Sequence, residues 1–122
     1  MRVLIVDDSH SMRLILSKYS SRLGFDPVET GDGFAALERL DSDLHFDAAL
    51  IDWDMPGMDG LQLLKAIRAN ADYDGMKTMM VTARTSMSCV AEALAHGADD
   101  YLMKPLDERM LAEKFRLLGL LN

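Results

Sequence analysis

The feature that most constrains the fold is a regular alternation of short apolar runs with helical patterns. Five runs are expected to form strands, at residues 3–6, 25–30, 47–51, 77–82 and 100–103. The first of them, VLIV, is apolar throughout and rich in β-branched residues, which is typical of a strand covered on both faces. Strand–helix units in succession predict an α/β fold, a doubly wound five-stranded parallel sheet with helices on both faces.

Apolar residues recur at helical spacing after each predicted strand. The stripes expected to face the sheet are, in chain order, Met12, Ile15, Leu16, Tyr19 and Leu23; Phe34, Leu37 and Leu40; Leu61, Leu64 and Ile67; Met87, Val90, Ala91 and Leu94; and Leu111, Phe115 and Leu118. Gly24 and Gly119 are expected to end the first and last helices. Cys89 lies off its stripe, so we expect it to be exposed. Pro27 cannot donate to a ladder, which predicts that the second strand lies at an edge of the sheet.

Composition and charge exclude several classes of protein. The 122 residues are expected to form one domain, 1–122, large enough for a single core. A formal charge of −7 without a Lys/Arg-rich stretch argues against direct nucleic-acid binding. No apolar run approaches the ~18 residues of a membrane span, and the N-terminus does not resemble a signal peptide. A lone cysteine fits a reducing compartment, so we expect a cytoplasmic protein without membrane insertion.

Polar side chains gather where the predicted strands end. The first strand ends in Asp7 and Asp8, the third in Asp52, the fourth in Thr82 and the fifth in Lys104. Carboxyl ends of parallel strands meet at one edge of the sheet, where ligands of such sheets bind. Three carboxylates beside one ammonium group leave an excess of negative charge, which a hard divalent cation would neutralise. The pattern therefore predicts a site for Mg²⁺ or Mn²⁺.

These motifs resemble the receiver domain of bacterial response regulators, in particular CheY-like single-domain receivers. The resemblance rests on DD after the first strand, DWDMPGMDG at the third, VTA at the fourth and YLMKP at the fifth, and it runs along the whole chain. It implies a flavodoxin-like strand order of 2-1-3-4-5, which agrees with an edge position for Pro27. It also implies a two-component signalling protein that takes a phosphoryl group from a histidine kinase or phosphotransfer protein, rather than an enzyme acting on a separate substrate.

The resemblance assigns roles to the acidic residues. Asp52 would be the phosphoacceptor, forming an acyl phosphate. Asp8 and Asp52 would bind Mg²⁺ directly, together with the backbone carbonyl of Asp54, and Asp7 would act through water. Phosphoryl transfer requires mainly positioning and charge neutralisation, which agrees with an acidic site that binds a metal ion.

The resemblance also assigns a conformational switch. Lys104 and Thr82 would bind oxygens of the phosphoryl group, and Tyr101 would move inward as Thr82 approaches that group. This movement would change the surface formed by the fourth helix, the fifth strand and the fifth helix, where a downstream protein would bind. The peptide bond before Pro105 is typically cis in the family.

Two residues depart from many chemotaxis-type receivers. Asp54 follows the phosphoacceptor by two positions, and Arg84 follows Thr82 by two. We expect them to form an ion pair across the mouth of the site and to modulate the loss of the phosphoryl group. Asp59, in contrast, is expected to cap the helix that starts at about residue 60. The fluorescence of Trp53, which adjoins the phosphoacceptor, is expected to respond to Mg²⁺.

Three other functions fit parts of the pattern. A phosphohydrolase of the haloacid dehalogenase type would use Asp52 and Asp54 as its Asp-x-Asp pair. Its nucleophile, however, follows the first strand of the core, where this chain has Asp7 and Asp8. A flavodoxin-like FMN binder would need a loop rich in hydrogen-bond donors at that place, and two aspartates have the wrong charge. A receiver fold used only for docking would not need the complete set of acidic and basic groups.

Overall fold

The computed structural model describes residues 1–42, 44–84 and 86–122. Within these ranges the strands form one parallel five-stranded sheet in the order β2-β1-β3-β4-β5. The strands are β1 (Arg2–Val6), β2 (Asp26–Thr30), β3 (Ala48–Ile51), β4 (Lys77–Thr82) and β5 (Asp100–Met103). The predicted fold class and strand order are confirmed, and Pro27 lies on an edge strand as expected.

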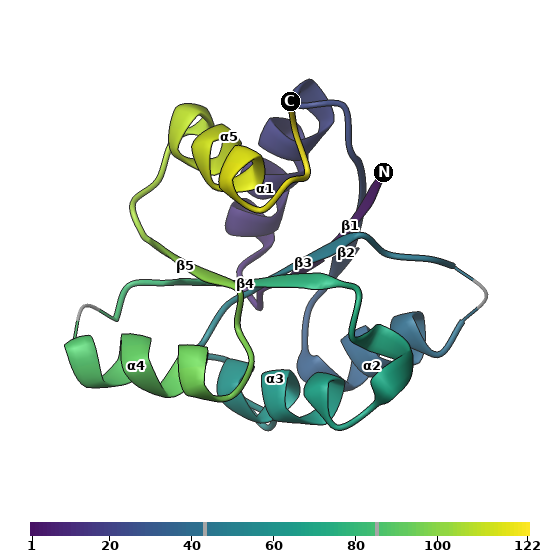
Figure 1. Ribbon diagram of the computed structural model, residues 1–122, viewed down its shortest axis with the longest axis vertical. Coiled ribbons are helices and arrows are strands. Elements are labelled where there is room, and N and C mark those ends of the chain that lie inside the picture. Colours follow the sequence, from purple (N-terminus) through teal and green to yellow (C-terminus); the bar gives the residue numbers. More distant parts are fainter. Residues whose placement is uncertain (43, 85) are drawn as a thin grey trace.

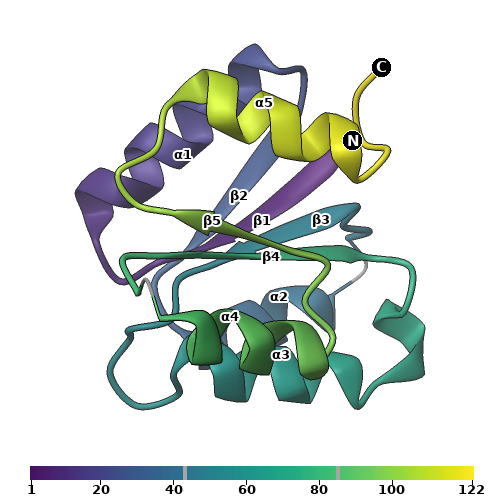
Figure 2. The ribbon, with the colours of Figure 1, turned by 60° about the vertical axis from the view of Figure 1, so that its left-hand side comes forward.

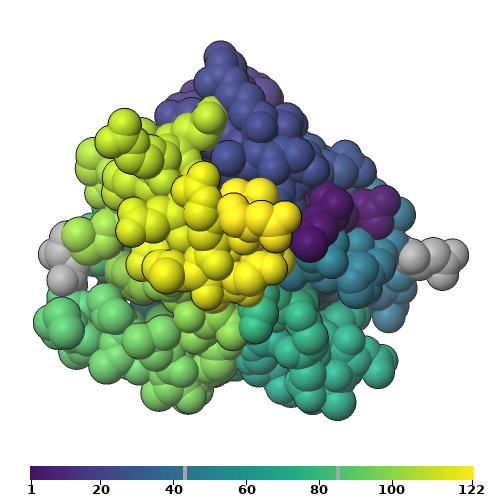
Figure 3. Space-filling view, turned by 45° about the horizontal axis from the view of Figure 1, so that its top comes forward, coloured from purple at the N-terminus to yellow at the C-terminus, as the bar shows by residue number. Residues whose placement is uncertain are grey.

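The helices cover both faces of the sheet (Figures 1 and 2). One layer holds α1 (His10–Arg22) and α5 (Glu108–Leu117). The other layer holds α2 (Gly33–Leu40), α3 (Gly60–Arg68) and α4 (Met87–Ala95). A short 3₁₀ turn, η1 (Ala71–Tyr73), was not predicted from the sequence. Figure 3 shows the α1 and α5 side of the molecule, where the C-terminal residues lie beside the N-terminal strand.

Side chains of β1 alternate between the two layers. Leu4 and Val6 belong to the core cluster on the α2–α4 side of the sheet, whereas Val3 and Ile5 belong to the cluster on the α1–α5 side. All four are at most 1% exposed. Because every residue of the run is covered, an uninterrupted apolar sequence is what this strand requires. The acidic residues that follow it are therefore anchored to a rigid strand.

The structure corrects the expected inner face of α4. Three of the four residues predicted to face the sheet are exposed, namely Met87, Ala91 and Leu94. Ala93 is fully buried instead, and Cys89, which we expected to be exposed, packs partly buried against the core. The helix carries apolar residues on both sides, so its period alone does not select a face.

Two other residues of the predicted stripes are also wrongly placed. Phe34 is 60% exposed and Ile15 is 41% exposed. Phe34 lies in the first turn of α2, before the point where Ala36 and Leu40 enter the core. On α1 the next residue, Leu16, takes the buried position.

The helices are short compared with the thickness of a bilayer. The longest described helix, α1, has 13 residues, whereas a membrane-spanning helix needs about 20. Among residues 1–42, 44–84 and 86–122, no helix combines the length and apolar character needed to cross a membrane.

Candidate functional site

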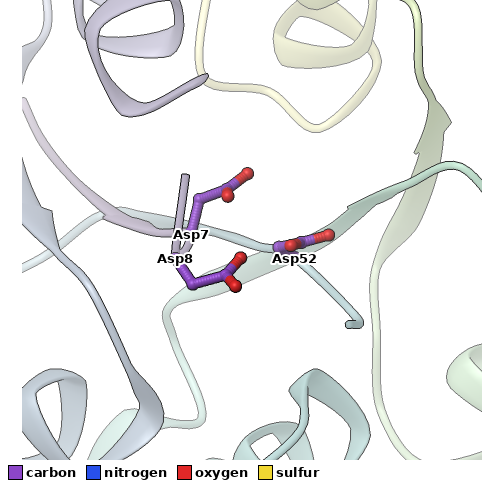
Figure 4. Close-up of side chains that lie close together, drawn as sticks. All are labelled: Asp7, Asp8 and Asp52. Atoms are coloured by element: carbon purple, nitrogen blue, oxygen red, sulfur yellow. The ribbon is translucent and has the colours of Figure 1, made fainter. Parts of the chain in front are cut away.

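Three carboxylates meet at the carboxyl end of the sheet, as predicted. Asp7 and Asp8 follow β1, and Asp52 follows the neighbouring strand β3. Among the described residues these three form a group in which one oxygen from each lies within 4.8 Å of the others. Figure 4 shows the Asp8 carboxylate directed toward Asp52. Asp7 and Asp52 are buried and Asp8 is exposed, so solvent reaches the group from one side.

Lys104 provides a positive charge within this group. Its Nζ lies 3.0 Å from Oδ2 of Asp7 and 3.3 Å from Oδ1 of Asp52. Burial by itself would lower the pKa of Lys104, but the hydrogen bond to Asp7 and the charge of Asp52 raise it above its ordinary value. The lysine therefore stays charged. It follows β5 directly, and the peptide bond to Pro105 is cis, as the resemblance implied.

The charges do not balance. Burial, followed by the charge of Asp7, raises the pKa of Asp52, and the nearby Lys104 only partly offsets this increase. A further positive charge beside Asp52 would favour the ionised form of this carboxylate. Because the available donors are all oxygens, they fit a hard cation such as Mg²⁺.

Thr82 and Tyr101 are connected through the backbone of Arg84. The Thr82 side chain is fully buried at the end of β4, and its hydroxyl accepts a hydrogen bond of 3.2 Å from the Arg84 N–H. The Tyr101 hydroxyl donates a hydrogen bond to the Arg84 carbonyl. Tyr101 is only 9% exposed and packs with the core of the α2–α4 side. Burial raises the pKa of Tyr101, so the phenol keeps the proton that it donates.

The predicted ion pair between Asp54 and Arg84 is present. Nη2 and Nε of Arg84 lie 2.6 Å and 3.1 Å from Oδ1 of Asp54. The guanidinium also lies over the ring of Trp53, 5.3 Å from its centroid. Arg84 therefore covers the residues that immediately follow Asp52, in contact with solvent.

The loop after Asp52 is closed by backbone contacts at Gly60. Its N–H donates to the Trp53 carbonyl at 2.8 Å. Asp59 caps α3, and its carboxylate and the Gln62 side chain form a reciprocal capping box. The structural role predicted for Asp59 is confirmed, and the capped helix fixes the far end of the loop that carries Asp54.

Sequence reasoning missed the contact that Arg13 makes with the site. Nη1 of Arg13, on α1, donates to the backbone carbonyl of Asp7 at 2.7 Å. The available signal was an arginine five residues after Asp8, in the first turns of the helix that follows the acidic pair. Arginines at the start of a helix are common on protein surfaces, so this position alone did not identify the contact.

Comparisons with known proteins agree with this geometry. The family model described as "Response regulator receiver domain" matches residues 3–116. The chain is 36% identical to chemotaxis protein CheY1 of Helicobacter pylori over 118 residues, which cover 96% of this chain and 95% of that protein. It is 40% identical to chemotaxis protein CheY of Pseudomonas aeruginosa, with coverage of 93% and 92%.

A solved structure gives the same result. Vibrio cholerae chemotaxis protein CheY4 superposes with a TM-score of 0.89 at 32% identity, covering 95% of this chain and 96% of that one. The comparisons give no support to a haloacid dehalogenase-like phosphohydrolase. Receiver domains are signalling modules that bind Mg²⁺ through acidic residues and interact with histidine kinases and downstream targets. From its matching model, its relatives and its fold, the chain belongs to the response regulator receiver domain family, as a receiver of the CheY type.

Proposed function

We propose that Asp52 is the phosphoacceptor of this receiver. The observation that carries the proposal is the position of Asp52 itself, whose carboxylate is buried between Asp7, Asp8 and Lys104 at the end of β3. A carboxylate oxygen of Asp52 attacks the phosphorus atom of a phosphohistidine on a kinase or phosphotransfer protein. The P–N bond breaks, the imidazole leaves with the electron pair, and an acyl phosphate forms on Asp52. The chain thus catalyses only its own phosphorylation and dephosphorylation.

The other residues of the site bind and orient the transferred group. Mg²⁺, or Mn²⁺, would neutralise the negative charge that accumulates during the transfer. Asp8, Asp52 and the backbone carbonyl of Asp54 would hold the ion directly, and Asp7 would act through water. Lys104, already beside Asp52, would bind one phosphoryl oxygen as a point charge, and the Thr82 hydroxyl would donate to another.

The output would pass from Thr82 to Tyr101. On phosphorylation the Thr82 hydroxyl would leave the Arg84 N–H to bind the phosphoryl group. The Arg84 carbonyl, which accepts from Tyr101 before this step, would keep that side chain inward. The population of this arrangement would then determine the shape of the α4–β5–α5 surface, where a downstream protein binds. The proposal treats residues 1–122 as one receiver domain that acts in the cytoplasm through protein contacts, without binding nucleic acid.

Acetyl phosphate tests the proposal directly. With Mg²⁺, the chain is expected to gain one phosphoryl group by intact-protein mass spectrometry, and an excess of EDTA is expected to prevent this. Sustained hydrolysis of phosphomonoesters would instead indicate a phosphohydrolase. A protein that gains no phosphoryl group would act only as a docking module, and a yellow protein would indicate bound flavin.

The raised pKa of Asp52 predicts how the free energy of unfolding depends on pH. A carboxyl group whose pKa is higher in the folded state stabilises the fold fully below its unfolded pKa, and this contribution is lost as pH rises through the folded pKa. Without metal, the wild type is therefore expected to lose stability relative to Asp52→Asn as pH rises above 3.8, the ordinary pKa of the group.

Urea unfolding in EDTA over a pH series measures this difference. Adding Mg²⁺ at neutral pH is expected to stabilise the wild type by about 2.7 kcal/mol at a hundred times its Kd, and to stabilise Asp52→Asn less. A difference between the two proteins that does not change with pH would contradict the assigned burial of the Asp52 charge.

Arg84→Ala is expected to accelerate loss of the phosphoryl group. The ion pair with Asp54 covers the mouth of the site, so its removal gives water easier access to the acyl phosphate. Because the pair is exposed and screened by water, we expect the rate to increase by no more than roughly fivefold. Decay of the phosphorylated protein after removal of acetyl phosphate measures the rate. Arg39→Ala, on the exposed side of α2, is the control, and equal decay in both variants would disprove this role.

A further inference from the structure

The segment that carries Asp7 and Asp8 joins β1 to α1 in three residues. Every polar group of Asp7 has a partner: its N–H donates to the Thr30 carbonyl at 3.2 Å, and its carboxylate accepts from Ser9 N–H at 2.9 Å and from Lys104. Its carbonyl accepts from Arg13 at 2.7 Å. That carbonyl belongs to the planar peptide between Asp7 and Asp8, so holding it fixes the N–Cα bond of Asp8 and restricts the directions in which the Asp8 side chain can leave the backbone.

Arg13 is itself held in place. Its Nε lies 3.5 Å from Oε1 of Glu29, at the end of β2, and its Nη2 lies 3.4 Å from Nδ1 of His10. The side chain is only 19% exposed. The guanidinium also lies close to Gly31, since a Cβ at that position would be 3.4 Å from Nη1. The planar guanidinium can bind the Asp7 carbonyl and Glu29 at the same time through different N–H groups. A lysine ammonium group would have to make both contacts from a single nitrogen.

A positive charge at this place does not help to bind a cation. Within the described ranges the guanidinium contacts Asp7 through its carbonyl, and its ion pair is with Glu29 rather than with a carboxylate of the metal-binding group. Its charge alone would weaken the attraction between the site and Mg²⁺. The arginine is therefore better explained by the geometry that it imposes on the backbone than by its charge.

We propose that Arg13 is a positioning residue for the metal site. Anchored on α1 and paired with Glu29, it binds the Asp7 carbonyl and so holds the Asp7–Asp8 peptide in the orientation that directs Asp8 toward Asp52 before the cation binds. The inference rests on the proposed function, because it assumes that Mg²⁺ binds at these carboxylates. Groups that orient metal ligands in this way contribute to metal affinity although they do not touch the metal.

Two substitutions separate geometry from charge. Arg13→Lys keeps the positive charge but loses the planar two-point attachment, and Arg13→Met removes the charge and keeps an apolar stem. Titration of Trp53 fluorescence with Mg²⁺ gives the affinity of each variant without any phosphoryl donor. Arg22→Lys is the matched control, since Arg22 lies on the same helix and forms an exposed pair with Glu108. Thermal unfolding in EDTA gives the stability of each metal-free protein.

We expect Arg13→Lys to weaken Mg²⁺ binding by about three- to tenfold, the effect of losing one hydrogen bond to the backbone. Arg13→Met is expected to bind no more tightly than the wild type, and Arg22→Lys to bind as the wild type does. Wild-type affinity in Arg13→Lys, tighter binding in Arg13→Met, or a loss of affinity that appears only together with unfolding of the metal-free protein would overturn the proposal. A wild type that binds no Mg²⁺ would instead overturn the proposed function.

Discussion

Asp52→Asn is expected to gain no phosphoryl group from acetyl phosphate under conditions in which the wild type gains one. The amide has nearly the shape of the carboxylate, but it has no anionic oxygen to attack phosphorus. It also removes one of the three carboxylates that lie within 4.8 Å of one another, so Mg²⁺ is expected to bind more weakly. Intact-protein mass spectrometry measures the uptake, and Trp53 fluorescence measures the binding of Mg²⁺.

A matched variant shows whether the effect is specific to Asp52. Asp54→Asn changes an aspartate two residues away whose side chain pairs with Arg84 rather than with the buried group. We expect it to accept the phosphoryl group, because the proposed role of Asp54 in metal binding uses its backbone carbonyl. Uptake by Asp52→Asn equal to that of the wild type would show that another residue is the acceptor.

Gly60→Ala is expected to lower the free energy of unfolding by about 3 kcal/mol, the upper part of the range for overpacking. A Cβ at this position would lie 2.2 Å from the Asp52 carbonyl oxygen and 2.8 Å from the Trp53 Cα. Both are backbone atoms, so rotation of a side chain cannot relieve the overlap. Alanine favours a helix over glycine by about 1 kcal/mol, and the steric overlap at the start of α3 is expected to exceed this gain.

Urea unfolding of Gly60→Ala and Gly75→Ala provides the comparison. A Cβ on Gly75 would meet no heavy atom of the described residues within 4 Å, apart from its chain neighbours. We therefore expect Gly75→Ala to change the free energy of unfolding by less than about 1 kcal/mol. Similar values for the two variants would show that the loop between Asp52 and α3 adapts without cost.

The arrangement of the strands was predictable because it depends on local features of the sequence, namely apolar runs and the position of a proline. An apolar run such as residues 3–6 requires cover on both faces, and Pro27 requires an edge. The convergence of Asp7, Asp8 and Asp52 followed from the parallel topology, which brings the ends of distant strands to one edge of the sheet.

The orientation of α4 was not predictable from its sequence. Its apolar residues occupy more than one side, so the helical period is compatible with several rotations about the helix axis. Packing against the sheet selected the small residue Ala93 for the buried position and left Leu94 exposed. The neighbouring elements, which are distant in the sequence, decide which side of the helix is buried.

The sequence by itself determined the α/β layers, the edge strand, the cap at Asp59 and the set of charged residues that meet at the sheet. Tertiary structure alone decided that Tyr101 lies inward on the Arg84 carbonyl and that Arg13 reaches the Asp7 carbonyl. The physical reason is that these two side chains bind backbone carbonyls rather than other side chains. A backbone carbonyl is present at every residue, so a long side chain that binds one leaves no pattern in the sequence, whereas burial and strand topology act on side chains whose identities are visible there.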